Sequence, residues 1–264
     1  MLGHMSISKE VFRLPGIVNK FTKAGLTLEI SRDLMLGKND RNIITDAEKL
    51  LPKFLKEVSI NFEGEENLQA SGLIAFNHPS SNVVLPAFLS LIVKVKELTG
   101  KDVSLLMASE ITLTSNLNDK IPIPGSIFFM KRFHNLYGNK IISSPTVTFR
   151  KDYLSGRAVA TRKVIKHLHN NEIVAIAPEG HVEINNEISP PESFHEGSGF
   201  LARMATKNGQ PIIPIGIWKE NDVVNLKIGK SVNILSEDNV QATKDLMKYI
   251  AENLPEKYRG PFKN

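Results

Sequence analysis

The chain has 264 residues, enough for one large domain or two small ones, and 41% of them are hydrophobic, enough for a sizeable core. The absence of cysteine excludes a disulfide framework, a thiolate nucleophile and a cysteine zinc site, and favours a cytoplasmic location. A formal net charge of +5 favours anionic partners such as a phospholipid surface, an acidic carrier protein or a phosphate-bearing substrate. No interleaved arginine and aromatic residues indicate binding of nucleic acid.

The N-terminal quarter is predicted to be a helical extension over residues 6–65, with residues 1–5 left over from cloning ahead of a native start at Met5. Helical periodicity continues as far as Asn61. An apolar stripe from Val11 to Phe21 can either pack on the domain or lie on a membrane surface.

Within this extension, Thr45 followed by Glu48 is typical of a capping box. The helix that it begins carries Leu50, Leu51, Phe54 and Leu55, and Pro52 is expected near its first turn.

Residues 66–264 are predicted to form one α/β domain with a mostly parallel sheet flanked by helices. The expected strands are Gly72–Phe76, Val103–Ala108, Glu172–Ala177, Pro211–Trp218 and Val223–Ile228. The expected helices are Ser81–Leu98, ending near Gly100, Ser126–Tyr137, and Gly156–Asn170 with Ser155 as its cap. The longest apolar run, Val83–Val93, is shorter than the roughly 18 residues that span a bilayer.

A histidine follows the first buried strand, in the loop Asn77-His78-Pro79-Ser80-Ser81-Asn82. Open α/β sheets bind ligands beyond the carboxyl ends of their strands, which is where His78 is expected. An imidazole titrates near neutral pH and can take a proton from a hydroxyl or amine as it attacks a carbonyl. A loop-capping histidine is the alternative.

The loop Pro178-Glu179-Gly180-His181 follows a later strand, so a carboxylate and a flexible backbone are expected near the same crevice. Next come Phe194-His195-Glu196-Gly197, opening a helix whose free amides can hold an anion, and the strand segment Pro211-Ile212-Ile213-Pro214.

Taken together and in this order, these segments resemble the phospholipid and glycerol-phosphate acyltransferase family over roughly residues 70–230. The family's Asn-His motif resembles Asn77-His78, and its Pro-Glu-Gly-Thr motif resembles Pro178-Glu179-Gly180. Its Phe-Lys-x-Gly segment resembles Phe194–Gly197, and its Pro-Ile-x-Pro motif resembles Pro211–Pro214. The resemblance implies that His78 is a general base.

A second family motif ends in arginine, and two arginines can match it. The family spacing, counted back from Glu179, favours Arg150 in Val147-Thr148-Phe149-Arg150. The alternative is Arg132, in a stretch that has the pattern of an amphipathic helix. The resemblance therefore implies a substrate-binding set consisting of Asn77, Ser81, Arg150, Glu179, Gly180 and His181.

Two positions depart from the family pattern. The family has an Asp five residues after its histidine, where this chain has Val83, so another carboxylate is expected to orient His78, and Glu110 is the nearest candidate. Where the family has an arginine after Glu-Gly-Thr, this chain has Val182, between His181 and Glu183. An uncharged hydroxyl or an amine suits these residues better than a phosphate.

The resemblance implies an enzyme of phospholipid biosynthesis and lipid metabolism that moves a fatty acyl group to a hydroxyl or amine of a lipid-type acceptor. The donor is expected to be a thioester of coenzyme A or acyl carrier protein, without cofactor or metal. The alternative is a catalytically impaired lipid-binding protein of the same fold, as the loss of the Asp at Val83 suggests.

Three further possibilities concern other residues. A serine hydrolase with Ser198 as nucleophile is disfavoured, because Gly197-Ser198-Gly199 lacks the Gly-x-Ser-x-Gly spacing of a nucleophile elbow. His167 and His169 are two residues apart on a predicted helix and so point in different directions, which disfavours a metal site. Peripheral binding to an anionic membrane on its inner face is expected, through the N-terminal stripe or through Phe128, Phe129 and Met130.

Overall fold

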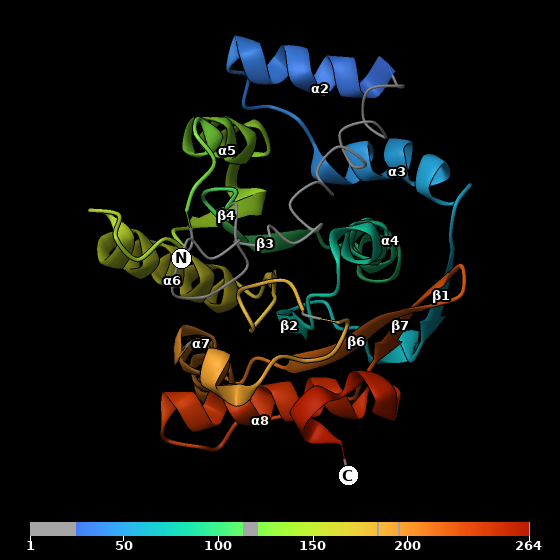
Figure 1. Cartoon of the computed structure of the whole chain (residues 1–264), viewed down its shortest axis with the longest axis vertical. Coiled ribbons are helices and arrows are strands. Elements are labelled where there is room, and N and C mark those ends of the chain that lie inside the picture. The colour runs from blue at the N-terminus through green and yellow to red at the C-terminus, as the bar shows by residue number, and fades with distance from the viewer. Residues whose placement is uncertain (1–24, 113–120, 184, 195, 264) are drawn as a thin grey trace, which may run out of the picture.

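A computed structural model describes residues 25–112, 121–183, 185–194 and 196–263 (Figure 1). Seven strands form one sheet in the order β1-β7-β6-β2-β5-β3-β4. Every neighbouring pair is parallel except β6 and β7, which form an antiparallel hairpin. The strands are β1 (Ser59–Glu63), β2 (Gly72–Phe76), β3 (Val103–Ala108), β4 (Ile141–Ser144), β5 (Ile173–Ile176), β6 (Ile212–Glu220) and β7 (Val223–Ile228).

Helices cover both faces of the sheet (Figure 1). They are α2 (Gly25–Leu36), α3 (Ile43–Phe54), α4 (Ser81–Thr99), α5 (Ser126–Leu136), α6 (Tyr153–His169), α7 (Glu196–Lys207) and α8 (Asn239–Glu252). Within the described residues, none is long and apolar enough to cross a membrane. The predicted mostly parallel sheet between helices is confirmed.

The core is divided by the sheet because successive side chains of a strand point to opposite faces. On one face, Leu73 and Ala75 of β2 pack with residues of α6, α7 and α8. On the other face, Ile74 and Phe76 pack with residues of α3 and α4. All five residues of β2 are buried, as expected for a central strand covered on both sides. Strand β2 is therefore held rigidly from both faces.

Two predicted helix starts are wrong. Helix α3 is capped by Asn42, whose side chain accepts hydrogen bonds from the backbone N–H groups of Ile44 and Thr45 at 2.9 and 3.1 Å. Thr45 consequently lies inside the first turn, and Pro52 lies near the end of the helix. Asparagine is among the strongest N-cap residues, and it precedes the predicted threonine cap.

Helix α6 begins at Tyr153 rather than Gly156, so Ser155 lies inside the helix rather than capping it. Gly156 is needed for packing, because a Cβ atom there would lie 2.5 Å from Cγ of Pro145.

Three elements differ in kind from the sequence analysis. Residues 59–63 form strand β1 on the edge of the sheet, although the helical pattern was extended to Asn61. Their side chains alternate between exposed and half-buried, which is the period of a strand. Neither the four-residue edge strand β4 nor helix α8 is among the elements expected from the sequence. The apolar stripe from Val11 to Phe21 lies outside the described residues.

Arg41 connects the N-terminal helices to the rest of the molecule. Its guanidinium binds Asp33 of α2 at 2.6 Å and Asp46 of α3 at 2.7 Å. The hydroxyl of Tyr137, just after α5, donates to the other oxygen of Asp46 at 2.9 Å. The backbone N–H of Arg41 donates to the carbonyl of Leu136 at 3.1 Å. One half-buried cation therefore fixes three helices relative to one another.

We expect Arg41→Leu to lower the free energy of unfolding by about 2 kcal/mol, because buried Asp46 keeps its charge without its guanidinium partner. Urea unfolding measures this loss. Lys263→Ala is the control, since Lys263 and Glu187 form an ion pair in which both side chains are 41% exposed, and its effect should stay below about 1 kcal/mol. Equal losses in the two variants would show that the Arg41 cluster contributes no more than a surface pair.

Candidate active site around His78

Loops from three strands meet at one edge of the sheet. Strand β2 ends at Phe76 just before His78, and β5 ends at Ile176 ahead of the loop that carries Glu179. Strand β2 lies between β5 and β6 and runs parallel to both. Because parallel strands share a carboxyl edge, the loops after β2 and β5 lie together with the end of β6, at the position where open α/β sheets bind ligands.

The side chain of Asn77 joins the end of β2 to its neighbours. It is 1% exposed, and its amide group donates to the carbonyl of Ile217 on β6 at 2.8 Å and accepts from the N–H of Ile217 at 2.7 Å. The same amide group donates to the carboxyl of Glu183 at 2.7 Å. Asn77 thus continues the strand pairing by one residue and fixes the backbone immediately before His78.

Glu179 is fully buried behind His78. Its carboxylate accepts hydrogen bonds from the backbone N–H of His78 at 3.1 Å and from that of Ser189 at 2.9 Å. Burial raises the pKa of Glu179, while these two N–H groups act in the opposite direction. Glu179 therefore positions the backbone of the histidine, as well as a loop ten residues further along the chain.

Glu183 is the second buried carboxyl group of the site. Its backbone N–H donates to the carbonyl of His78 at 2.8 Å. Burial, followed by repulsion from Glu179, raises the pKa of Glu183 to about 8, although the hydrogen bond from Asn77 lowers it. Glu179 accepts two backbone N–H groups and is the better site for the negative charge, so Glu183 is protonated at neutral pH.

Gly180 and His181 complete the same loop. Gly180 has a φ of 68°, which glycine adopts without strain, and the chain turns there. The imidazole of His181 lies between two oxygens, with Nδ1 2.7 Å from the carbonyl of Glu179 and Nε2 2.9 Å from the hydroxyl of Ser189. His181 therefore braces the loop and lies within the predicted site.

The imidazole of His78 is held in one tautomer. Its Nδ1 lies 3.2 Å from the carbonyl oxygen of Pro79, and because a carbonyl can only accept, this contact requires the proton on Nδ1. Nε2 then carries the lone pair of a base. A backbone carbonyl commonly orients histidine in this way. The side chain is half-buried, so Nε2 is not sealed inside the core.

Val83, at the position where the family has an Asp, is 4% exposed and packs in the core with residues of α4 and the sheet. It can offer no hydrogen bond to His78.

The carboxylate of Glu110 is engaged by other groups. One oxygen accepts from the backbone N–H of Thr146 at 2.5 Å, the hydroxyl of Thr146 at 2.8 Å and the N–H of Val147 at 2.9 Å. The other oxygen binds the Ser109 hydroxyl and the Arg150 guanidinium. Burial raises the pKa of Glu110, but these hydrogen bonds and the charge of Arg150 lower it overall. The predicted orienting carboxylate is thus saturated by Arg150 and its loop.

The two candidate arginines have different surroundings. Arg150 lies just beyond the carboxyl end of β4 and binds Glu110, Ser109 and the exposed carboxylate of Asp152. Arg132 instead donates to the carbonyls of Leu34 and Met35 at the end of α2, at 2.8 and 2.7 Å. Arg132 is therefore used to cap a helix, and Arg150 is the arginine near the strand ends.

Ser81, the remaining predicted site residue, is the exposed first residue of α4, three residues after His78. Of the residues set aside in the sequence analysis, His167 binds Glu172 through Nδ1 at 2.7 Å, and the hydroxyl of Ser198 donates to the carbonyl of Pro178 at 3.1 Å. In the part of the chain that the structure describes, no three metal-ligating side chains cluster.

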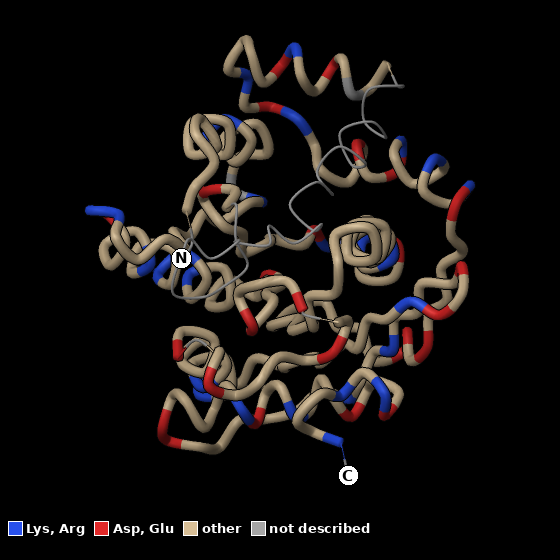
Figure 2. Tube along the Cα trace, in the orientation of Figure 1, with Lys and Arg blue, Asp and Glu red and all other residues tan. Residues whose placement is uncertain are grey.

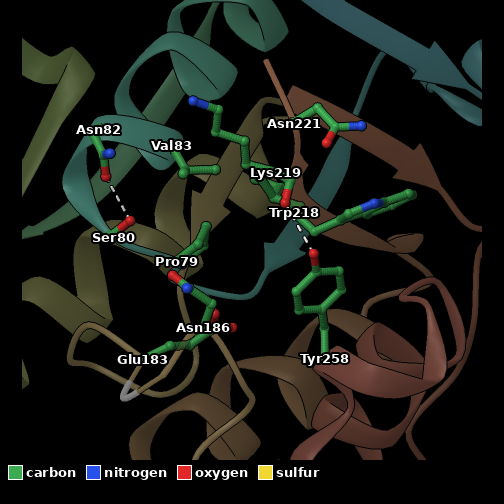
Figure 3. A pocket seen from close by; sticks show the side chains of 11 residues that line it. Pro79, Ser80, Asn82, Val83, Glu183, Asn186, Trp218, Lys219, Asn221 and Tyr258 are labelled. Atoms are coloured by element: carbon green, nitrogen blue, oxygen red, sulfur yellow. Dashed lines mark hydrogen bonds between the residues drawn. The ribbon is translucent and has the colours of Figure 1, made fainter. Parts of the chain in front are cut away.

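A pocket of about 290 Å³ opens beside His78 (Figure 3). Pro79, Ser80, Asn82 and Val83 form one side, after β2. The other side consists of residues that the sequence analysis does not select, namely Asn186, Ile217, Trp218, Lys219, Asn221 and Tyr258, together with Glu183. No local motif marks these residues, because they come from three distant segments of the chain.

We expect Glu183→Gln to change how stability depends on pH. The folded pKa of Glu183, about 8, lies above the ordinary value of 4.5. The stability that the protonated Glu183 contributes to the folded protein is therefore fully present below pH 4.5 and is lost as pH rises through about 8. The free energy of unfolding of the wild type should fall relative to that of Glu183→Gln between pH 5 and 8.5, by on the order of 4 kcal/mol. Denaturant unfolding at several pH values tests this, with Glu187→Gln as the exposed control. Parallel pH profiles for the wild type and Glu183→Gln would contradict it.

The arrangement agrees with a comparison against protein families. The family model named Acyltransferase matches residues 59–218, more than half of the chain. Among solved structures, PlsC of Thermotoga maritima, a 1-acyl-sn-glycerophosphate (LPA) acyltransferase, is similar with 17% identity and a TM-score of 0.47, over 92% of this chain and 88% of that chain. No curated protein sequence matches. The match of the family model confirms the resemblance seen in the sequence, and the chain belongs to the acyltransferase family.

Proposed function

We propose that the protein moves a fatty acyl group from a thioester to a hydroxyl or amine of a lipid-type acceptor, with Nε2 of His78 as general base. The observation that carries this proposal is the contact of Nδ1 with the carbonyl of Pro79, which leaves Nε2 able to take a proton. The family supports acyl transfer, and the strand-end position supports the choice of histidine.

In the proposed reaction, His78 takes a proton from the acceptor as its oxygen or nitrogen attacks the thioester carbonyl. The tetrahedral intermediate then expels the thiolate of coenzyme A or acyl carrier protein, which receives the proton from the imidazolium. The first two residues of α4, Ser81 and Asn82, can offer their backbone N–H groups to the oxyanion, whereas those of Val83 and Val84 donate to the carbonyl of Ser80. Neither a metal nor a further cofactor takes part in this proposal.

A carboxylate beside a catalytic histidine both selects its tautomer and stabilises the imidazolium, and the carbonyl of Pro79 provides only the first of these effects. It selects the tautomer of His78, but it carries no full charge to stabilise the imidazolium. We propose that Glu110 is a positioning residue that holds Arg150 rather than the histidine. Arg150 can then bind an anionic part of a substrate that displaces the exposed Asp152. Glu179 and Gly180 fix the loop on the other side of the acceptor.

We expect His78→Ala to lower kcat for acyl transfer about 10³-fold, because the variant lacks the side chain that takes the proton from the acceptor. The assay uses purified protein, radiolabelled acyl thioesters of coenzyme A and of acyl carrier protein, and a panel of acceptors. His169→Ala is the matched control, since His169 is an exposed histidine of α6 that contacts Asn208. Equal rates for the wild type and His78→Ala would exclude the histidine as base.

The loss of a carboxylate at Val83 favours one alternative, a lipid-binding protein that no longer catalyses transfer. In that case the wild type would bind acyl thioester but show no turnover above His78→Ala with any acceptor. Turnover that disappears in the variant excludes this alternative.

We also propose that the protein binds an anionic membrane at its cytoplasmic face. The apolar side chains that support this are exposed at the end of α2 and the start of α5, namely Met35, Leu36, Phe128 and Phe129. Arg132 connects the two helices, since it donates to the carbonyl of Met35 and lies 4.8 Å over the ring of Phe128. Basic residues are interspersed along these elements (Figure 2). Met130 was included in the sequence prediction, but it is buried and cannot contribute.

We expect the double variant Phe128→Ser, Phe129→Ser to reduce binding to anionic vesicles at least tenfold, because two aromatic side chains no longer enter the lipid interface. Flotation with vesicles of phosphatidylglycerol and phosphatidylcholine measures this. Leu235→Ser is the control, as Leu235 is equally apolar and 83% exposed but lies outside these helices. Undiminished flotation of the double variant would rule out this surface.

A further inference from the structure

The pocket beside His78 shares one wall with the loop that carries the Asn-His motif, but most of its other lining lies outside the family motifs. Neither Arg150 nor the Gly180–His181 turn lines it. Its far wall comes from the end of β6, from the turn after β6 and from Tyr258, whose hydroxyl donates to the carbonyl of Lys219 at 3.0 Å (Figure 3). The near wall is Pro79 and Val83, next to the histidine. The pocket is connected to His78 through the backbone, because Pro79 follows the histidine directly and the N–H of Glu183 donates to the carbonyl of His78 at 2.8 Å.

Amide side chains of asparagine stand at the mouth of this pocket. Asn186 and Asn221 both line it, and both have left-handed backbones, with φ of 58° and 53°. Asparagine tolerates this conformation better than most residues, so these turns can keep a side chain where glycine would give none. Both residues are exposed, and neither side chain hydrogen-bonds to another described residue, so four donor hydrogens and two acceptor oxygens can meet a ligand.

A third amide, that of Asn82, adds donors on the near side. Its oxygen accepts from the hydroxyl of Ser80 at 2.6 Å, which leaves its two N–H groups available. Each amide presents a donor and an acceptor side by side, which matches the pairs of neighbouring hydroxyls on a polyol or a sugar ring. The volume of about 290 Å³ suits one such group and is small for a larger one.

The charges around the pocket balance at neutral pH. Among the described residues that line the pocket, Lys219 is the one cation, and it lies 3.5 Å from the carboxylate of Asp222. Glu183 is the one carboxyl group among them, and burial raises its pKa to about 8, which favours its protonated form at neutral pH. A phosphate would meet a single, already paired cation, and an ammonium would meet no free carboxylate. An uncharged head group with several hydroxyls needs no charged partner and can bind here through hydrogen bonds alone.

We propose that this pocket is the acceptor head-group site and that it selects an uncharged polyhydroxyl group, such as a sugar or a polyol, on a lipid. The inference rests on the proposed function of His78, because the pocket opens beside that residue. It also names the class of acceptor that the departure at Val182 leaves open.

The test compares acceptors that differ only in head group: monoacylglycerol, its phosphate, its phosphoethanolamine ester and its hexoside. Wild-type protein is assayed with radiolabelled acyl thioesters of coenzyme A and of acyl carrier protein. We expect kcat/KM to be at least tenfold higher for the hexoside than for the other three. If either phosphate-bearing acceptor is best, the proposal is wrong.

Matched variants then locate the preference. Asn186→Asp and Asn221→Asp keep the left-handed turn but remove the amide donors, and Asn185→Asp changes a neighbouring residue with a φ of 60° that does not line the pocket. We expect each pocket variant to reduce the preference for the hexoside over monoacylglycerol about tenfold, the effect of losing one hydrogen bond of about 1.4 kcal/mol. Asn185→Asp should keep it. If all three variants keep the preference of the wild type for the hexoside, the proposal is overturned.

Calorimetric binding of the acyl hexoside without donor separates this inference from the proposed function. If no acceptor is acylated but Asn186→Asp still weakens hexoside binding about tenfold, the pocket assignment holds and the acyl-transfer reaction fails. If transfer proceeds but hexoside binding is the same in the wild type and Asn186→Asp, the reaction holds and the pocket assignment fails.

Discussion

Two buried carboxyl groups, Glu179 and Glu183, hold the candidate site together. Glu179 takes the backbone N–H of His78, and Glu183 is tied to both Asn77 and the carbonyl of His78. Burying carboxyl groups is costly unless hydrogen bonds compensate, and two such groups close together cannot both remain charged. The site resolves this by giving the charge to Glu179, which has two backbone donors, and the proton to Glu183. The backbone of His78 is consequently held on both its N–H and its C=O.

This arrangement explains how a histidine can be useful without the carboxylate that the family pattern places five residues later. The oxygen that faces Nδ1 belongs to the very next residue, Pro79, so a local backbone group takes part in orienting the ring. The backbone around that residue is in turn fixed by Asn77 and the two glutamates. A backbone carbonyl carries no full charge, so this contact stabilises positive charge on the ring less than an aspartate would.

The sequence allowed the sheet and the strand-end loops to be predicted because β2, β3 and β5 are short, almost continuous apolar runs followed by polar loops. His78 and Glu179 could be selected for that reason. Strand β1 was missed since its apolar residues follow a helical pattern without a clear break, and β4 was missed since it has only four residues. Asn186, Asn221 and Tyr258 meet only through the tertiary fold, so no local spacing identifies them. Apart from the adjacent Ser109, the partners of Glu110 are equally hard to predict, because they lie 36 to 40 residues away.

Strand β6 has nine residues while its partner β2 has five, so the last part of β6 and its turn continue past the end of β2. This overhang pairs with β7 and forms a wall of the pocket, and its contact with the segment after β2 is made by the side chain of Asn77. Insertions or deletions in that single turn can therefore reshape the wall while the strand that carries the histidine stays unchanged. The fold thus allows the reaction and the choice of acceptor to diverge independently during evolution.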